Sequence, residues 1–245
     1  MFERIKYWYR AVRYKYKLDK VEIRYILANV KQGQIAVDIG AHKGGYLYWL
    51  QKKVGSKGWV FAFEPQPKLS QYLLKICAKK KYKNVIIENM GVSAQKGSFD
   101  LFLPNGKSSS PGASLQKHHK TTSKFHNSIE IQTTTLDEYF LKERYLKPHF
   151  LKIDVEGHEL EVFKGGEQLL KEVKPKILVE CEQRHLHDTS IDQVFQFLLD
   201  LGYKGYFIHQ NEWKPLIHFS VGKHQRIMDG RYWMSPDYCN NFIFE

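Results

Sequence analysis

Length and composition leave room for one folded domain and argue against several classes of protein. The chain has 245 residues, of which 42% are apolar, so it can bury one full hydrophobic core without a second domain. No apolar run reaches the roughly 18 residues that a membrane span requires, and the first residues lack the apolar stretch of a secretory signal. We therefore expect a cytoplasmic protein. The three cysteines have no paired spacing, which predicts neither a disulfide framework nor a zinc site.

The chain is strongly basic. Lys and Arg number 38 against 26 Asp and Glu, a net charge of +12, and much of the excess lies in residues 1–31 and 75–83. Such a surface attracts nucleic acid, anionic lipid headgroups or a charged glycan. A solvated basic face without a partner explains the same residues.

Residues 1–31 form a basic extension before the first predicted strand. Apolar and aromatic residues at spacings of three and four, interleaved with Lys and Arg, predict one or two amphipathic helices in residues 3–27. Such helices can pack on the domain, cover a substrate or lie on a membrane surface as a peripheral contact. Packing is the interpretation we favour, because aromatic stripes at helical spacing are usually core.

Residues 32–245 alternate strands and helices, which predicts an α/β domain. Parallel strands with crossovers on both faces follow from this order. A polar stretch at 105–127, flanked by a predicted hairpin of 98–103 with 129–133, is typical of a lid or binding loop. The expected strands of a mostly parallel seven-stranded sheet are 35–39, 59–63, 85–88, 149–155, 176–180, 203–208 and 241–244. The expected helices are 46–54, 69–79, one that begins at 135–139, 159–173 and 191–201.

A glycine turn follows the first predicted strand, where open α/β sheets bind their ligands. Gly40 and Gly44 let the backbone turn tightly and approach a ligand closely. Glu64 ends the neighbouring strand, where a carboxylate can accept both hydroxyls of a ribose. His42 stands where a dinucleotide motif has its second glycine, which argues against a pyrophosphate. Asp38 would repel phosphates but suits a ligand that carries an ammonium and a sulfonium group, as S-adenosylmethionine does.

Four motifs together resemble one known family. They are Asp-Ile-Gly-Ala-x-x-Gly at 38–44, Phe-Glu-Pro-x-Pro at 63–67, Thr-Leu-Asp-Glu-Tyr at 135–139, and Leu-Lys-Ile-Asp-Val-Glu-Gly-His-Glu at 151–159 with a following Gly-Gly. This set is similar to the FkbM methyltransferases and covers roughly residues 34–182. The resemblance implies a class I Rossmann-like methyltransferase fold and S-adenosylmethionine-dependent transfer of methyl to oxygen. The family commonly has Asn where His42 stands.

The resemblance also implies which residues hold the cofactor. Helix capping explains single acids at strand ends, but acids at three strand ends favour ligand binding. The implied residues are Asp38, Gly40, Ala41, His42 and Gly44 around the methionine part, Glu64 at the ribose, Asn89, Gly91 and Val92 near the adenine, and Asp154 beside the transferable methyl.

A hydroxyl acceptor needs a base to remove its proton. His158 is the first candidate, because imidazole titrates near neutral pH. Asp154 and Glu156 can do the same work, as can His185, so the assignment among these catalytic candidates stays open.

A divalent metal is the remaining question about the site. Asp154, Glu180 and Glu182 could supply oxygen ligands, and an ion there would lower the pKa of the acceptor hydroxyl. Ion pairs with Lys152 or Arg184 explain the same acids, and we favour a site without metal.

The favoured function is an O-methyltransferase acting on a hydroxyl of a glycan or other small hydroxylated metabolite, with residues 105–127 as a lid or acceptor loop. One alternative is an RNA methyltransferase, which the charge of +12 suggests, but the chain has no recognisable RNA-binding appendage. The other is a non-catalytic module that binds a membrane surface or a partner through residues 1–31.

Overall fold

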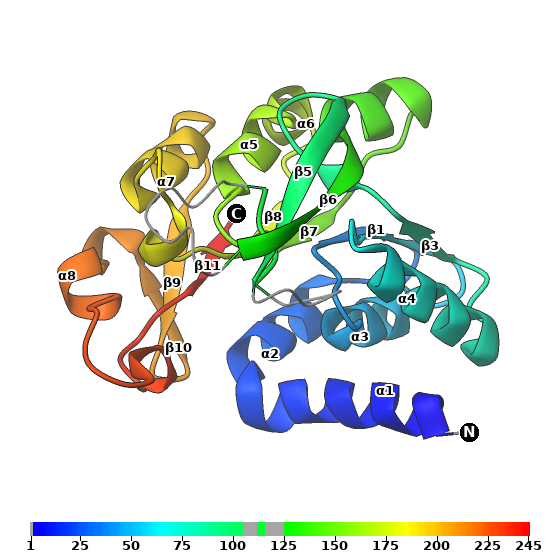
Figure 1. Ribbon diagram of the computed structural model, residues 1–245, viewed down its shortest axis with the longest axis horizontal. Helices are drawn as coiled ribbons and strands as arrows, with labels where there is room; N and C mark the ends of the chain where they lie inside the picture. The colour runs from blue at the N-terminus through cyan, green and yellow to red at the C-terminus, as the bar shows by residue number, and fades with distance from the viewer. Residues whose placement is uncertain (1, 105–111, 116–124) are drawn as a thin grey trace.

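The central element is an eight-stranded sheet, which the computed structural model describes together with the rest of residues 2–104, 112–115 and 125–245 (Figure 1). Its strand order is β10-β9-β11-β8-β7-β1-β2-β3. The neighbours from β8 to β3 are parallel, whereas β11 runs antiparallel to β8 and β9, and β10 antiparallel to β9. The strands are β1 (Ile35–Ile39), β2 (Trp59–Phe63), β3 (Val85–Glu88), β7 (Phe150–Ile153), β8 (Lys176–Glu180), β9 (Gly205–His209), β10 (Glu212–Pro215) and β11 (Asn241–Phe244).

A second, smaller sheet stands beside the carboxyl ends of the central strands. It has the order β4-β6-β5, formed by β4 (Gly91–Val92), β5 (Gly97–Pro104) and β6 (Phe125–Thr134). The antiparallel pairing of β5 with β6 confirms the predicted hairpin. Most of the stretch predicted as a lid, residues 105–127, lies outside the described residues. Residues 112–115 are described, and Ser114 forms a bridge with Phe102 of β5.

Helices cover both faces of the central sheet, as the alternation of its buried residues requires. Val37 and Ile39 of β1 pack in one core with Phe163, while Ala36 packs in a second core with Leu47 and other residues of the N-terminal half. The first core holds η2 (Asp137–Glu143), α5 (Glu159–Lys164), α6 (Glu167–Glu172) and α7 (Ile191–Asp200); the second holds α1 (Phe2–Arg13), α2 (Lys20–Asn29), α3 (Gly45–Val54) and α4 (Pro67–Lys80). Short elements complete the chain: η1 (Tyr14–Leu18), η3 (Gln183–His185), η4 (Leu216–His218), α8 (Val221–His224) and η5 (Tyr232–Met234).

Two features of the predicted fold were wrong, and two strands have other bounds than predicted: 149–155 is β7 (Phe150–Ile153) and 203–208 is β9 (Gly205–His209). The helix predicted at 159–173 is two short helices, because Gly165 and Gly166 weaken the helix and the Asp137 carboxylate binds the amides of Gln168 and Leu169 at the start of α6. The central sheet has eight strands where seven were predicted, since β10 is a short edge strand whose exposed, charged residues carry no apolar pattern. Across the described residues, none of the helices combines the length and apolar character that a membrane crossing demands.

Candidate functional site

A cavity of about 270 Å³ opens at the carboxyl ends of β1, β2, β7 and β8, where the smaller sheet faces the central one. Its wall is built from segments that are far apart in the sequence. The predicted residues that line it are Gly40, His42, Glu64, Gly91, Val92, Asp154, Glu156, His158 and Glu180. Three of the four catalytic candidates, Asp154, Glu156 and His158, are therefore brought to one cavity, together with the glycine turn and the acid that follows β2. His185 is not among the residues that line it.

The turn after β1 requires a glycine at position 40. Gly40 has φ +79°, and a Cβ on it would lie 1.8 Å from the backbone oxygen of Asp154. The turn after β1 therefore touches the end of β7, and no other residue fits without moving one of the strands. This contact shapes the floor of the cavity.

Glu64 is held in place by the backbone around it. Its carboxylate accepts hydrogen bonds from the amides of His42 (2.7 Å) and Gln66 (2.9 Å). Burial raises the pKa of Glu64 to about 7, an effect that these two hydrogen bonds oppose. An ionised carboxylate has about four acceptor positions, so capacity remains for the hydroxyls of a ribose.

Asp38 is buried with few polar contacts. The residue is 1% exposed, and within the described chain no hydrogen bond of standard geometry reaches either carboxylate oxygen, although the backbone amide of Leu47 lies near enough to lower its pKa. Burial raises the pKa of Asp38 to about 6, although the nearby charge of Lys152 opposes the rise. Asp38 does not line the cavity itself, but lies one residue before its floor at Ile39 and Gly40.

Lys152 lies at the centre of a buried cluster of charged side chains. It was not predicted as a cofactor-binding residue. It is the register partner of Asp38 on the neighbouring strand, and its Nζ donates to Asp154 Oδ2 at 3.0 Å. Burial lowers the pKa of Lys152, but Asp154, Asp38 and Glu180 outweigh this and raise it above the usual range. One lysine thus faces three acids, and the surplus negative charge favours a cationic ligand.

Three further predicted cofactor residues do not line the cavity and have contacts within the fold. Ala41 is packed in the core that contains α3, and Gly44 begins that helix with φ +74°. The side-chain amide of Asn89 donates to the backbone oxygens of Glu64 (3.0 Å) and Pro65 (2.9 Å). Asn89 therefore fixes the loop that carries Glu64 and does not line the cavity.

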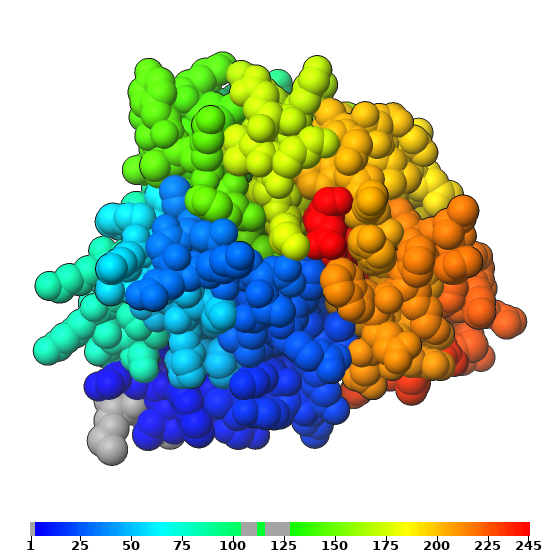
Figure 2. Space-filling view, turned by 180° about the vertical axis from the view of Figure 1, so that it is seen from behind, coloured from blue at the N-terminus to red at the C-terminus, as the bar shows by residue number. Residues whose placement is uncertain are grey.

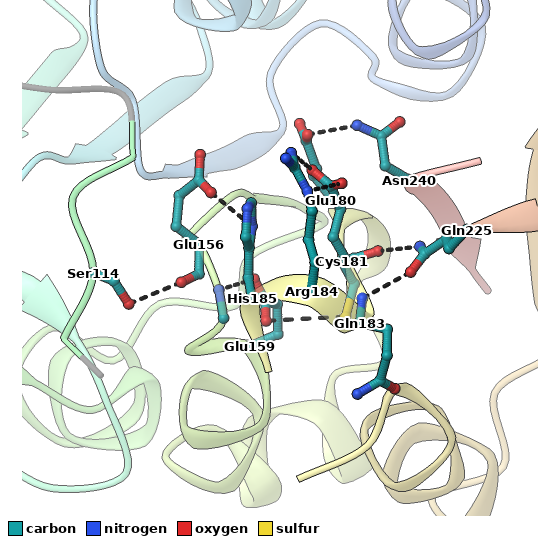
Figure 3. A network of polar contacts seen from close by, with 12 residues as sticks. Ser114, Glu156, Glu159, Glu180, Cys181, Gln183, Arg184, His185, Gln225 and Asn240 are labelled. Carbon is teal, nitrogen blue, oxygen red and sulfur yellow. Dashed lines mark hydrogen bonds and ion pairs between the residues drawn. The ribbon is translucent and has the colours of Figure 1, made fainter. Parts of the chain in front are cut away.

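Glu156 is paired with His185, as Figure 3 shows. His185 Nδ1 lies 2.8 Å from Glu156 Oε2, and the hydroxyl of Ser114 donates to the backbone oxygen of Glu156 at 2.9 Å. Burial raises the pKa of the Glu156 carboxyl. Burial lowers the pKa of His185, but the hydrogen bond and charge of Glu156 outweigh it, so the net shift is upward. A carboxylate with a raised pKa at a cavity wall is suited to accept a proton.

His158 lies in a different environment from Glu156. Its Nε2 is 2.9 Å from the hydroxyl of Ser93, and its buried Nδ1 has no partner in the described parts of the chain. Burial lowers the pKa of His158 to about 4, so the ring is neutral at neutral pH. A neutral ring with an unsatisfied nitrogen is better suited to hydrogen bond with a ligand than to take its proton.

The three acids considered as metal ligands point to separate partners. Glu182 is held by Arg184 at 2.6 and 2.8 Å and by the hydroxyl of Tyr238, while Glu180 accepts from Asn240 at 2.6 Å. Figure 3 shows Glu180 turned toward Asn240. Among the residues described, no group of three or more His, Cys, Asp or Glu could hold a metal ion. These side chains do not fit a divalent site.

Tyr14 lines the cavity although it lies in the N-terminal extension. Its ring covers Gly45, where a Cβ would lie 3.1 Å from three ring atoms, and packs edge-on against Tyr46 at 5.5 Å between ring centres. Tyr46 in turn donates to Asp19 Oδ2 at 2.9 Å. In the sequence, only the helical spacing of Tyr14 from Tyr7 and Ala11 indicates that its side chain points inward. That spacing does not indicate which cavity the side chain reaches.

Comparisons with known proteins agree with this geometry. A family model of the FkbM methyltransferase domain matches residues 38–204. The hexuronic acid methyltransferase AglP of Haloferax volcanii is 32% identical over 151 residues, which cover 62% of this chain and 57% of AglP. Methyltransferase sdnD of Sordaria araneosa is 24% identical over 237 residues, covering 82% of this chain and 89% of sdnD. The crystal structure of methyltransferase FkbM from Methylobacillus flagellatus KT has a TM-score of 0.54 at 15% identity, covering 99% of this chain and 55% of that chain.

The parallel sheet, its antiparallel strand β11 and the glycine turn after β1 define a class I Rossmann-like methyltransferase. The family match covers more than half of the chain and includes the turn after β1, Glu64 and the end of β7. The chain belongs to the FkbM methyltransferase family.

Proposed function

We propose that this protein transfers a methyl group from S-adenosylmethionine to a hydroxyl group of a glycan or another small hydroxylated molecule. The observation that carries the proposal is the convergence of the Gly40 turn, Glu64, Asp154 and Glu156 on one cavity. The hexuronic acid methyltransferase AglP, a relative that extends beyond the part matched here, supports a sugar as the acceptor.

The residues present fit S-adenosylmethionine. Glu64 would bind the ribose hydroxyls, and the buried acids Asp38 and Asp154 would attract the positively charged methionine part. A Cβ at Gly40 would fill part of the space beside Asp154, which explains the need for glycine there. When bound, S-adenosylmethionine supplies an electrophilic methyl group on a positively charged sulfur.

The protein's own part in the reaction is to orient the acceptor and remove one proton. We assign the proton acceptor to Glu156, because burial raises its pKa and it lines the cavity. His185 is a positioning residue that holds Glu156 Oε2. His158 would hydrogen bond with the acceptor through the nitrogen that has no partner in the described structure.

Radiolabel transfer tests the proposal directly. The purified protein is incubated with methyl-labelled S-adenosylmethionine and, separately, with oligosaccharides that contain hexuronic acid, neutral oligosaccharides and RNA. Label in either oligosaccharide, lost in Glu156→Gln, supports the proposal, and the sugar that takes it up identifies the acceptor class. Label in RNA alone, or cofactor binding without transfer to any hydroxyl, contradicts it. The comparisons favour neither the RNA methyltransferase nor the non-catalytic module.

A further inference from the structure

The N-terminal extension has an outward face that nothing in the described structure covers. On α1, Tyr7 and Ala11 are fully buried against the domain, as residues four apart on one side of a helix should be. The opposite side carries Ile5, Trp8 and Tyr9, which are 51%, 49% and 63% exposed. The exposed apolar surface continues on η1, and we define the outer stripe as Ile5, Trp8, Tyr9, Tyr16 (64% exposed) and Leu18 (47% exposed).

Positive charge flanks the outer stripe. The acids of the same segment are occupied elsewhere: Glu3 pairs with Lys79 of α4, Asp19 accepts from Tyr46, and Glu22 is buried. Apart from Glu3, which is paired with Lys79, the exposed charged side chains around the stripe are basic, namely Arg4, Lys6, Arg13, Lys17 and Lys20.

The extension lies at the margin of the molecule. Figure 1 shows α1 outside α3 and α4, and Figure 2 shows the blue N-terminal segment along the lower rim of the opposite view. A partner can therefore approach the outer stripe without displacing the domain. Aromatic and aliphatic side chains exposed together on one helix normally mark a contact surface.

We propose that the outer stripe and its basic rim bind the surface of an anionic lipid bilayer. Trp and Tyr rings settle at the headgroup level, Ile and Leu enter the acyl boundary, and Lys and Arg attract anionic headgroups. The face suits lipid better than RNA, because the aliphatic Ile5 and Leu18 offer nothing to stacking bases. It also disfavours self-association, since two copies of a predominantly basic face repel each other.

The N-terminal extension carries both the outer stripe and one residue of the cavity wall. Tyr14 lines the cavity from the same segment that carries Tyr9 and Tyr16 on its outside. A bilayer held on the outer stripe would lie about one helix diameter, ~10 Å, from that cavity wall. Binding by this face does not depend on which acceptor the enzyme uses.

Vesicle sedimentation tests the proposal with the full chain. Vesicles of phosphatidylcholine alone are compared with an equimolar mixture of phosphatidylcholine and phosphatidylglycerol. We expect binding to the mixed vesicles, weakened by added salt, and little binding to phosphatidylcholine. Equal binding to both vesicles, or binding to neither while single-stranded RNA is bound, overturns the proposal.

Matched variants distinguish binding through the outer stripe from the general attraction between a basic protein and an anionic bilayer. Arg13→Glu with Lys17→Glu, and separately Trp8→Ser with Tyr9→Ser, should each lower partition into mixed vesicles by more than about tenfold. Lys147→Glu with Lys171→Glu makes the same charge change on other exposed residues and should change it less than about twofold. Retained circular dichroism and calorimetric binding of S-adenosylmethionine show that each variant is folded. Equal loss in the control pair, or a dimer that only Trp8→Ser with Tyr9→Ser dissociates, contradicts the proposal.

Discussion

The buried Asp38 carboxylate lowers the stability of the ligand-free protein at neutral pH but favours the binding of a cationic ligand. Its carboxylate is buried, accepts no hydrogen bond of standard geometry in the described chain, and has a pKa that burial raises from 3.8 to about 6. A carboxyl whose folded pKa is raised contributes its full stability below the unfolded pKa and loses it as pH rises through the folded pKa. At neutral pH the ionised group is therefore a cost to the ligand-free fold. A bound cation would offset that cost.

Asp38→Asn should separate the two effects. Removing the charge should raise the free energy of unfolding of the ligand-free protein at pH 7.5 by roughly 1–3 kcal/mol, measured by urea denaturation. Affinity for S-adenosylmethionine, measured by calorimetry, should fall by about tenfold or more, because the attraction between the buried carboxylate and the cationic ligand is lost.

The exposed Asp229→Asn serves as the control and should change neither quantity. A stabilised Asp38→Asn protein that binds the cofactor normally would show that Asp38 has only a structural role.

Glu156 and His158 should respond differently to substitution. Glu156→Gln keeps the shape but cannot accept a proton, so kcat should fall by about 100-fold or more. His158→Ala removes a neutral ring and should mainly raise the KM for the acceptor, with kcat lowered less than about tenfold. Steady-state kinetics with a saturating cofactor measures both. If His158→Ala loses as much kcat as Glu156→Gln, the histidine is the base, as its position in the sequence first suggested.

The elements differ in how far the sequence could predict them. The bounds predicted for β1, β2, β3 and β8 were confirmed, because each is an apolar run between turn signals, mostly buried in β1, β2 and β8 and half-buried in β3. The break between α5 and α6 was missed, since it depends on Asp137, which binds amides about 30 residues away in the chain. Local pattern predicts the strands of this fold, whereas caps from distant residues require the tertiary structure.

The residues of the candidate site also differ in how far the sequence could predict them. Gly40, Glu64 and Asp154 were predictable because the carboxyl ends of parallel strands meet at one edge of a sheet. Lys152 was assigned only as a pairing partner, although strand register places it beside Asp38. Tyr14 reaches the cavity by the packing of η1 on α3, which no motif encodes.

Substituting the tyrosines of η1 tests whether the extension completes the site. Tyr14→Ala removes an aromatic wall and should raise the KM for the acceptor by roughly five- to tenfold, since an aromatic contact contributes about 1–1.5 kcal/mol. Affinity for S-adenosylmethionine should be unchanged. Tyr16→Ala, an exposed neighbour on the same element, is the matched control and should leave both unaltered. Weaker cofactor binding with a normal acceptor KM would place Tyr14 on the cofactor side.

Across the whole molecule, buried acids determine how stability depends on pH. Burial raises the pKa of Glu22 to about 8, and the pKa values of Glu64 and Glu159 to about 7. The folded protein therefore keeps protons that the unfolded chain has released, and stability falls as pH rises through these values. Burial lowers the pKa of His42 and His158 to about 4, so these rings cost stability only as pH falls below 6.5. Near neutral pH and above, the acids outweigh the two rings, which predicts stability that falls as pH rises.

We expect the free energy of unfolding of the ligand-free protein to fall by on the order of 2 kcal/mol between about pH 6.5 and 8. Urea denaturation at each pH measures this, with the slope of the transition checked for two-state behaviour. Glu22→Gln should flatten the fall, because it removes an acid whose pKa burial raises to about 8 and which lies away from the cavity. The exposed Glu212→Gln should leave the profile unchanged. Stability that rises from pH 6.5 to 8 would mean that the buried acids ionise without cost, and that the Lys152 cluster and the surrounding backbone compensate their charge in full.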